Sequence, residues 1–233
     1  MGDLASEPRR NSVSALIELY SVVIAIALSY AIFNQINTES VWRESGIFKN
    51  TGSLWNLLTF LAVLIPFYHG AVRHLQIRYL ENAPGTKIYS FTLFISFLLL
   101  FAEGIFFIAF GAALGTFSNV IIAAFALITL DVVWGLFVLA TPGDKRDKRE
   151  TAAVLSWIIL NVVTAFALGV VIFLSPSAWV AWPPEVQLFV FMLTRTVFDY
   201  AVSWRFYFPL ESAEQKEPTP KPQTPSSLHR QGD

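Results

Sequence analysis

Six stretches of about 20 apolar residues follow one another along this chain of 233 residues. A helix needs about 20 apolar residues to cross the ~30 Å hydrocarbon core of a bilayer, and its backbone groups must bond within the segment. The pattern therefore predicts an all-α, polytopic integral membrane protein with six transmembrane helices. The predicted spans are Val13–Phe33, Leu54–Arg73, Tyr89–Gly111, Ser118–Ala140, Ala152–Leu174 and Glu185–Arg205.

The composition supports membrane lipid as the main surroundings of the chain. Charged residues make up 14% of it, whereas a soluble domain carries about 25%. The net charge of -1 argues against a nucleic-acid partner. The absence of cysteine excludes disulfides and thiolate metal sites, and three histidines are too few for a haem or zinc site. We therefore expect no cofactor and no metal.

The distribution of Lys and Arg predicts the orientation of the spans. With the N-terminus inside, 13 of the 16 basic residues fall on the cytoplasmic side, Arg43 and Lys49 fall outside, and Arg195 lies within the membrane. We expect a cytoplasmic N-terminus (1–12), a transmembrane domain (13–209) and a disordered cytoplasmic tail (210–233) rich in Pro and polar residues. The expected location is the bacterial inner (plasma) membrane. The sequence leaves open whether the protein forms a homo-oligomer.

The sixth predicted span carries two charges inside its apolar run. Arg195 and Asp199 are four residues apart, so they project from one face of a helix. A charge at membrane depth costs roughly 2.5–3.5 kcal/mol on insertion scales, so each needs partners on neighbouring spans. The order of the pair, cation before acid, is the weaker one against the helix dipole. We therefore expect Arg195 to prefer Asp131 or Glu103 on another span.

Eight polar side chains are predicted to form a buried polar network or proton relay. Counting by the helical rise places Asp131, Asn161 and Arg195 near the midplane and Glu103 closer to the outer face. Carboxylates outnumber guanidinium groups at this depth, and an uncompensated carboxylate in lipid takes up a proton or recruits a cation. The predicted set is Glu18, His69, Arg73, Glu103, Asp131, Asn161, Arg195 and Asp199.

This set predicts a transporter or channel for protons or small cations. The alternative is a non-catalytic membrane scaffold or accessory subunit whose buried charges fix helix packing, because protonated acids also hydrogen-bond between helices, at about 0.6 kcal/mol each. An intramembrane enzyme has the least support, since no catalytic motif stands out.

Local patterns add three expectations about helix geometry. Pro66 donates no backbone hydrogen bond, so the second span should kink or break near Ala62, just before His69. The small-xxx-small run from Gly111 to Gly115 is compatible with either a helix-packing face or a loop. In the first span, a small and polar stripe is expected to face the bundle interior: Glu18, Ser21, Ala25 and Ser29.

The first two predicted spans also resemble a known family. Residues 17–27 (IELYSVVIAIA) are similar to the first-helix signature of the six-span endolysosomal and bacterial potassium channels, and residues 68–74 (YHGAVRH) resemble the basic, histidine-containing end of that family's second helix. The resemblance implies potassium conduction. The family's hallmark, Phe-Ser-Asp, is here Tyr20-Ser21-Val22. This departure argues against conduction by that family's mechanism, and no functional residue is carried over.

Overall fold

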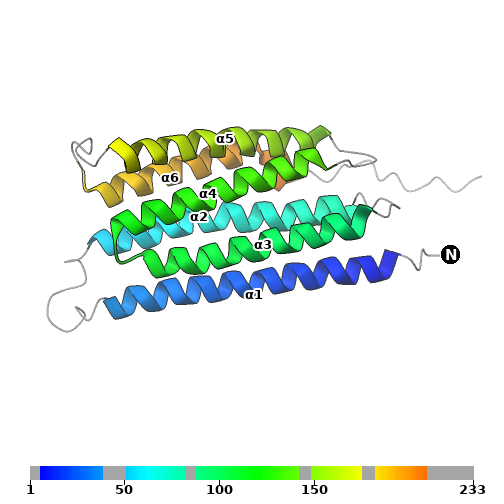
Figure 1. The fold of residues 1–233 in the computed structure, drawn as a ribbon, viewed down its shortest axis with the longest axis horizontal. Helices are drawn as coiled ribbons and strands as arrows, with labels where there is room; N and C mark the ends of the chain where they lie inside the picture. The colour runs from blue at the N-terminus through cyan, green and yellow to red at the C-terminus, as the bar shows by residue number, and fades with distance from the viewer. Residues whose placement is uncertain (1–5, 39–50, 82–87, 142–147, 175–181, 209–233) are drawn as a thin grey trace, which may run out of the picture.

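The computed structural model describes residues 6–38, 51–81, 88–141, 148–174 and 182–208, and every regular element in these ranges is helical. Figure 1 shows the long helices lying side by side along one axis and alternating in direction. The elements are α1 (Ser6–Thr38), α2 (Thr51–Leu75), the π-helical η2 (Gln76–Glu81), α3 (Ile88–Ala113), α4 (Phe117–Ala140), α5 (Lys148–Leu174), α6 (Pro184–Val202) and α7 (Trp204–Tyr207).

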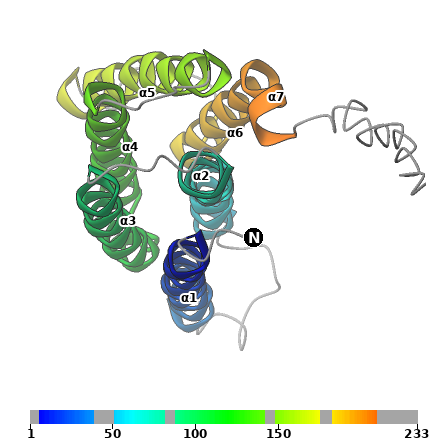
Figure 2. The ribbon, with the colours of Figure 1, turned by 90° about the vertical axis from the view of Figure 1, so that its right-hand side faces the viewer.

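The second helix is the most enclosed element of the bundle. Seen end-on in Figure 2, α2 lies between α1 and α6, while α3, α4 and α5 form the other side. Within its membrane-span window 56% of α2 is buried, against 22% of the window in α1. Its Phe60 packs edge-on against Phe107 and Phe110 of α3, with ring centroids 6.1 Å and 5.4 Å apart. Helices arranged around α2 therefore share one core.

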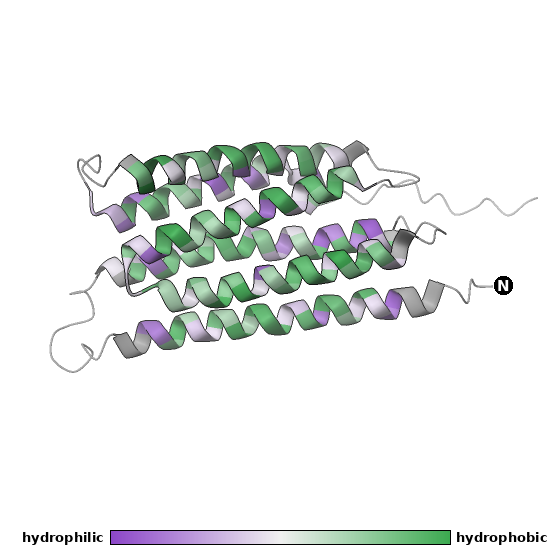
Figure 3. Ribbon diagram, viewed as in Figure 1, coloured by the Kyte–Doolittle hydropathy of each residue, from purple (hydrophilic) through white to green (hydrophobic). Residues whose placement is uncertain are grey.

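In the part of the chain that the structure describes, which is helical throughout its regular elements, five helices are long and apolar enough to cross a membrane, as in a multi-pass membrane protein: Arg10–Gln35, Leu54–Leu80, Ser90–Ala113, Phe117–Ala140 and Thr151–Phe173. Most of their residues are hydrophobic (Figure 3), and apolar side chains such as Phe166 and Phe173 are 74% and 83% exposed, as lipid-facing residues would be. The sixth predicted span is not among the five, because the 19 residues of α6 include Glu185, Arg195 and Asp199. It stays a prediction.

Two helices extend beyond the predicted boundaries. The second span does not end at Arg73, since α2 continues through η2 to Glu81. The buried side chains of Leu75, Ile77 and Tyr79 hold this extension against the bundle. The first helix likewise begins before Val13 and runs on to Thr38. The predicted outer connection is therefore helical at both ends, and its residues 39–50, like the tail from 209 onward, lie outside the described residues.

The expectation that a small and polar stripe of α1 faces the interior was wrong. Glu18, Ala25 and Ser29 are exposed, and only Ser21 is half-buried. The inward face is formed by the buried side chains of Val13, Leu16, Tyr20, Ile24, Ala27 and Ala31. Burial of these larger apolar groups outweighs the contribution of the smaller stripe, so the helix is rotated toward them.

Gly111 is the packing residue that brings α3 close to α1. A Cβ atom at this position would lie 3.1 Å from the carbonyl oxygen of Ala27 and 3.2 Å from the Cβ of Ala31. The contact explains why small residues face one another here, as they do where membrane helices approach closely. Gly115 lies in the turn after α3, and an added Cβ there would meet nothing within 4 Å. Only the first glycine of the pair therefore serves packing.

Pro66 does not break the second helix. The α2 helix runs without interruption from Thr51 to Leu75 with Pro66 inside it. The missing backbone donor leaves the carbonyl of Ala62 without its usual partner, and the hydroxyl of Thr196 on α6 donates to that oxygen at 2.6 Å. A side chain from the neighbouring helix thus replaces the lost hydrogen bond, as is common for proline in membrane helices.

Candidate functional site

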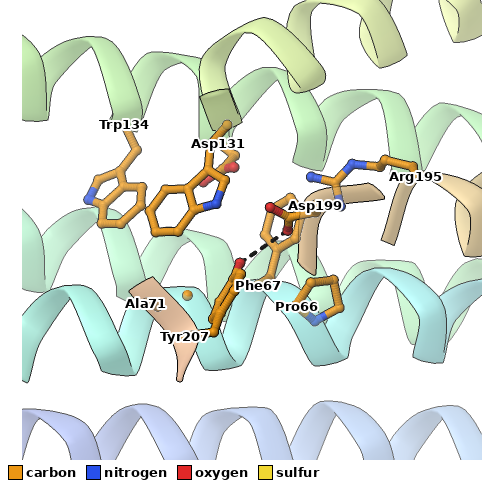
Figure 4. Close-up of a pocket in the computed structure, with 10 residues that line it drawn as sticks. Pro66, Phe67, Ala71, Asp131, Trp134, Arg195, Asp199 and Tyr207 are labelled. Carbon is orange, nitrogen blue, oxygen red and sulfur yellow. Dashed lines mark hydrogen bonds between the residues drawn. The ribbon is translucent and has the colours of Figure 1, made fainter. Parts of the chain in front are cut away.

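A central cluster of polar side chains joins α4, α5, α6 and α7, and we define it as Asp131, Asn161, Arg195, Asp199 and Tyr207. Asn161 Nδ2 donates to Asp131 Oδ2, and Arg195 Nη2 donates to Asn161 Oδ1. The hydroxyl of Tyr207 donates to Asp199 Oδ2 at 3.1 Å (Figure 4). The three helices α4, α5 and α6 are therefore connected through side chains at the depth where the sequence predicted the midplane.

Arg195 is the positive centre of this cluster and is only 5% exposed. Its guanidinium lies over the ring of Phe67, 5.4 Å from the centroid, and both Asp199 and Asp131 act on its charge. It reaches Asp131 through Asn161, so the expected preference for another span takes the form of a bridge. Within the described chain, Nε and Nη1 have no hydrogen-bond partner.

A small polar cavity of about 20 Å³ lies at the cluster. Asp131, Arg195, Asp199, Tyr207 and Trp157 contribute to its wall, together with Pro66, Phe67, Gly70, Ala71 and Trp134. A cavity needs roughly 10–15 Å³ and two to four polar partners to hold a water molecule. The cavity meets both requirements, since the guanidinium offers donors and the carboxylates offer acceptors.

The indole of Trp157 is a further member of this wall. Its N–H interacts with Asp199, yet neither Trp157 Nε1 nor Asp199 Oδ1 completes a hydrogen bond of ordinary geometry in the part of the chain that is described. Both atoms are buried, so both retain hydrogen-bonding capacity that the described protein does not satisfy.

Glu103 belongs to a second polar group, between α1, α2 and α3. Tyr20 donates to Glu103 Oε1 at 2.7 Å, and the ring of Tyr20 stacks on Tyr68 with centroids 5.7 Å apart. The hydroxyls of Tyr68 and Ser21 are 2.8 Å apart. Glu103 is within electrostatic range of Asp131 but does not join the central cluster by a hydrogen bond. Its acid group is held mainly by a phenol.

His69 adjoins the central cluster on the side that the sequence predicts to be cytoplasmic. Its Nδ1 is 3.2 Å from the hydroxyl of Tyr200, and its ring lies 4.8 Å from that of Tyr207. Arg73 Nε donates to the carbonyl oxygen of Phe206 at 3.1 Å. Tyr207 thus connects the surroundings of His69 with Asp199.

The predicted polar set is therefore divided in the fold. Asp131, Asn161, Arg195 and Asp199 meet in one cluster, His69 and Arg73 adjoin it, Glu103 has its own partner, and Glu18 is exposed on α1. Sequence reasoning missed Tyr207 and Trp157. No charge pattern marks an aromatic residue as a hydrogen-bond partner, and the only available signal was the position of Tyr207 eight residues after Asp199.

Comparison of the chain with protein families, curated proteins and solved structures finds no match. The resemblance of the first two spans to the potassium channel family stays a prediction. Function is therefore argued from the geometry and the chemistry of the central cluster.

Proposed function

We propose that the protein moves protons, or exchanges them for small cations, across the membrane. The observation that carries this proposal is the placement of one buried guanidinium, that of Arg195, with two acids, Asp131 and Asp199, in the wall of one polar cavity. The arrangement supports a site that gains and loses a proton. The cluster is neutral when one aspartate is protonated, and it carries a net negative charge when both are ionised.

The charge balance of the cluster supports an exchangeable proton. One guanidinium neutralises one carboxylate, so with both Asp131 and Asp199 ionised the cluster has a net charge of -1. An uncompensated charge away from water costs several kcal/mol, of the order given for buried ions. A bound proton or a cation removes that cost. Loading and unloading of this one positive charge is the elementary step of the proposed transport.

The proton is the ion that the dimensions favour. A cavity of about 20 Å³ accepts a water molecule but leaves no room for a hydrated metal cation. From Asp199 the hydroxyl of Tyr207 and the ring of His69 continue toward the predicted cytoplasmic end. A histidine at that end is suited to exchanging protons near neutral pH. Larger cations would require the helices around the cluster to move apart.

Transport across the full membrane requires α6 to be the sixth span, with both termini in the cytoplasm, and we place the protein in the bacterial inner membrane. Packing of α6 against α2 and the apolar side chains on its outer face, such as Val197 and Phe198, support this topology. The chain has no cysteine, so Trp182→Cys before α6 and Phe208→Cys after α7 can be labelled singly. Labelling by an impermeant maleimide should occur from opposite sides. Labelling of both from one side would refute the sixth span.

Proton movement can be measured with the purified protein in liposomes that contain a pH-sensitive dye. We expect Asp199→Asn and Asp131→Asn to abolish the flux driven by a proton gradient. Glu18→Gln is the matched control, because this acid is exposed on α1 and should leave the flux unchanged. Flux that is equal in the wild type and in both aspartate variants would rule out the central cluster as the proton site.

The alternative function, a membrane scaffold or accessory subunit, is favoured by one observation. The bridge from Arg195 through Asn161 to Asp131 ties α6, α5 and α4 together. In this case Asp131→Asn should reduce expression or the midpoint of detergent unfolding, while the wild type shows no proton flux. A folded Asp131→Asn variant that has lost the flux of the wild type would exclude the scaffold as the sole role.

A further inference from the structure

A groove of about 320 Å³ separates α5 from α6 on the outside of the bundle. Figure 2 shows that α5 is inclined to α6. The walls of the groove are Ile159, Leu160 and Val163 of α5 and Phe198 and Val202 of α6, with Ser156 beside them. Ile159, Val163, Phe198 and Val202 are all more than half exposed, so the groove opens on a face that lipid would cover.

The inner end of this apolar groove is polar. It is formed by Asp199 and Ser203, which are 4% and 3% exposed. Asp199 Oδ1 and Ser203 Oγ have no complete hydrogen bond to any described part of the protein. A carboxylate oxygen and a hydroxyl that are buried in this way call for a donor, since a buried polar atom without a partner costs roughly 1–3 kcal/mol.

Asp199 is also the residue that connects the groove with the central cluster, because it lines the 20 Å³ polar cavity as well as the groove. A ligand that enters from the lipid side would therefore meet the same carboxylate that takes part in the proposed proton site. An ammonium group bound there would stand in the place of the exchangeable proton and neutralise the same excess negative charge.

We propose that the groove binds a lipophilic organic monocation, namely an ammonium group on an aromatic or short alkyl body. The ammonium donates to Asp199 and Ser203, and the apolar body lies along Ile159, Val163 and Phe198. Pockets for small organic ligands span ≈ 300–1,000 Å³ and combine apolar walls with a few polar groups, which matches this groove. The identity of the cargo rests on the proposed function, whereas binding itself does not require transport.

Charge and shape together select this class of ligand. A lipid acyl chain would fill the apolar walls but offer no donor to Asp199 Oδ1, the carboxylate oxygen that Tyr207 does not reach. A small inorganic cation would satisfy Asp199 but would lose its hydration between apolar side chains, which is costly. A molecule with a cationic end and an apolar body satisfies both parts of the groove and, unlike a neutral alcohol, also neutralises the excess negative charge at Asp199.

Calorimetric titration of the full chain in detergent tests the proposal, with 4-phenylbutylammonium as the probe and 4-phenylbutanol as its neutral analogue. We expect the ammonium compound to bind at least about tenfold more tightly than the alcohol. Val163→Trp should weaken binding by about tenfold or more, because an indole would occupy the groove. Val162→Trp is its control, since Val162 is also lipid-exposed on α5 but does not line the groove.

The contribution of charge is tested by Asp199→Asn against Glu103→Gln, a buried acid of a different site. Binding should be lost in the first and kept in the second. Equal binding of amine and alcohol, or undiminished binding in Val163→Trp, would overturn the proposal. Val163 is 59% exposed, so its substitution leaves the core intact even where Asp199→Asn fails to fold. Binding of the ammonium probe by a protein that shows no proton flux would refute the proposed function alone. Proton flux in a protein that does not bind the ammonium probe would refute this inference alone.

Discussion

The hydrogen bond between Thr196 and the carbonyl of Ala62 yields a sharp test of how the bundle accommodates Pro66. Thr196→Val removes the hydroxyl and keeps the shape of the side chain, so the carbonyl loses the donor that replaces the missing backbone N–H. A hydrogen bond between membrane helices is worth about 0.6 kcal/mol on average and up to about 1.7. An unsatisfied carbonyl adds to this loss. We expect Thr196→Val to reduce the free energy of unfolding by about 1 kcal/mol.

The same substitution should cost almost nothing in the Pro66→Ala background. An alanine at that position supplies a backbone N–H to the oxygen of Ala62, four residues earlier, so the hydroxyl of Thr196 becomes dispensable. The double-mutant cycle of Thr196→Val and Pro66→Ala therefore predicts a coupling energy of about 1 kcal/mol. Unfolding by increasing mole fraction of SDS in mixed micelles, followed by far-UV circular dichroism, measures all four proteins. An equal loss from Thr196→Val in both backgrounds would refute the reasoning.

Two further substitutions, each paired with a control at another glycine, test the polar cavity and the close approach of α1 and α3. Gly70→Ala places a Cβ at 3.4 Å from the hydroxyl of Tyr207, which is an ordinary contact at the wall of the polar cavity. This variant should lower proton flux in liposomes without destabilising the protein. The control, Gly169→Ala on α5, should leave the flux unchanged. Undiminished flux in Gly70→Ala would separate the cavity from proton movement. Gly111→Ala forces α1 away from α3 and should lower the free energy of unfolding in SDS by about 1–3 kcal/mol. The control, Gly115→Ala, should lower it only slightly. Equal losses of stability in the two variants would show that the close approach of α1 and α3 is unimportant.

The residues of α6 illustrate how far the sequence could be interpreted. The spacing of Arg195 and Asp199 predicted that both point to one side of a helix and need partners from other spans, and both are buried in the bundle. The partner actually contacted by Arg195 is Asn161, because the angle and rotation of α5 bring this amide between the guanidinium and Asp131. The depth of a residue in the membrane follows from counting along the helix, but which side of the helix points into the bundle depends on the neighbouring helices.

The first helix shows the limit of pattern reasoning. Its polar stripe looked suited to the interior, yet Glu18 is exposed and Tyr20 reaches Glu103 instead. The contact of Gly111 with Ala27 and Ala31 brings α3 close to the buried apolar face of α1. Such a contact joins residues that lie far apart along the chain, and it leaves no periodic signal in the sequence.

The sequence by itself determined the all-helical class, the membrane as solvent and the places along the chain where helices and buried charges occur. These properties depend on length and local hydrophobicity, which each segment carries alone. Only the tertiary structure decided which acid meets which base, that Tyr207 and Trp157 belong to the central cluster and its wall, and that Asp199 is reached from a groove between α5 and α6. Those outcomes depend on how the helices rotate against one another, which is settled by packing between distant segments.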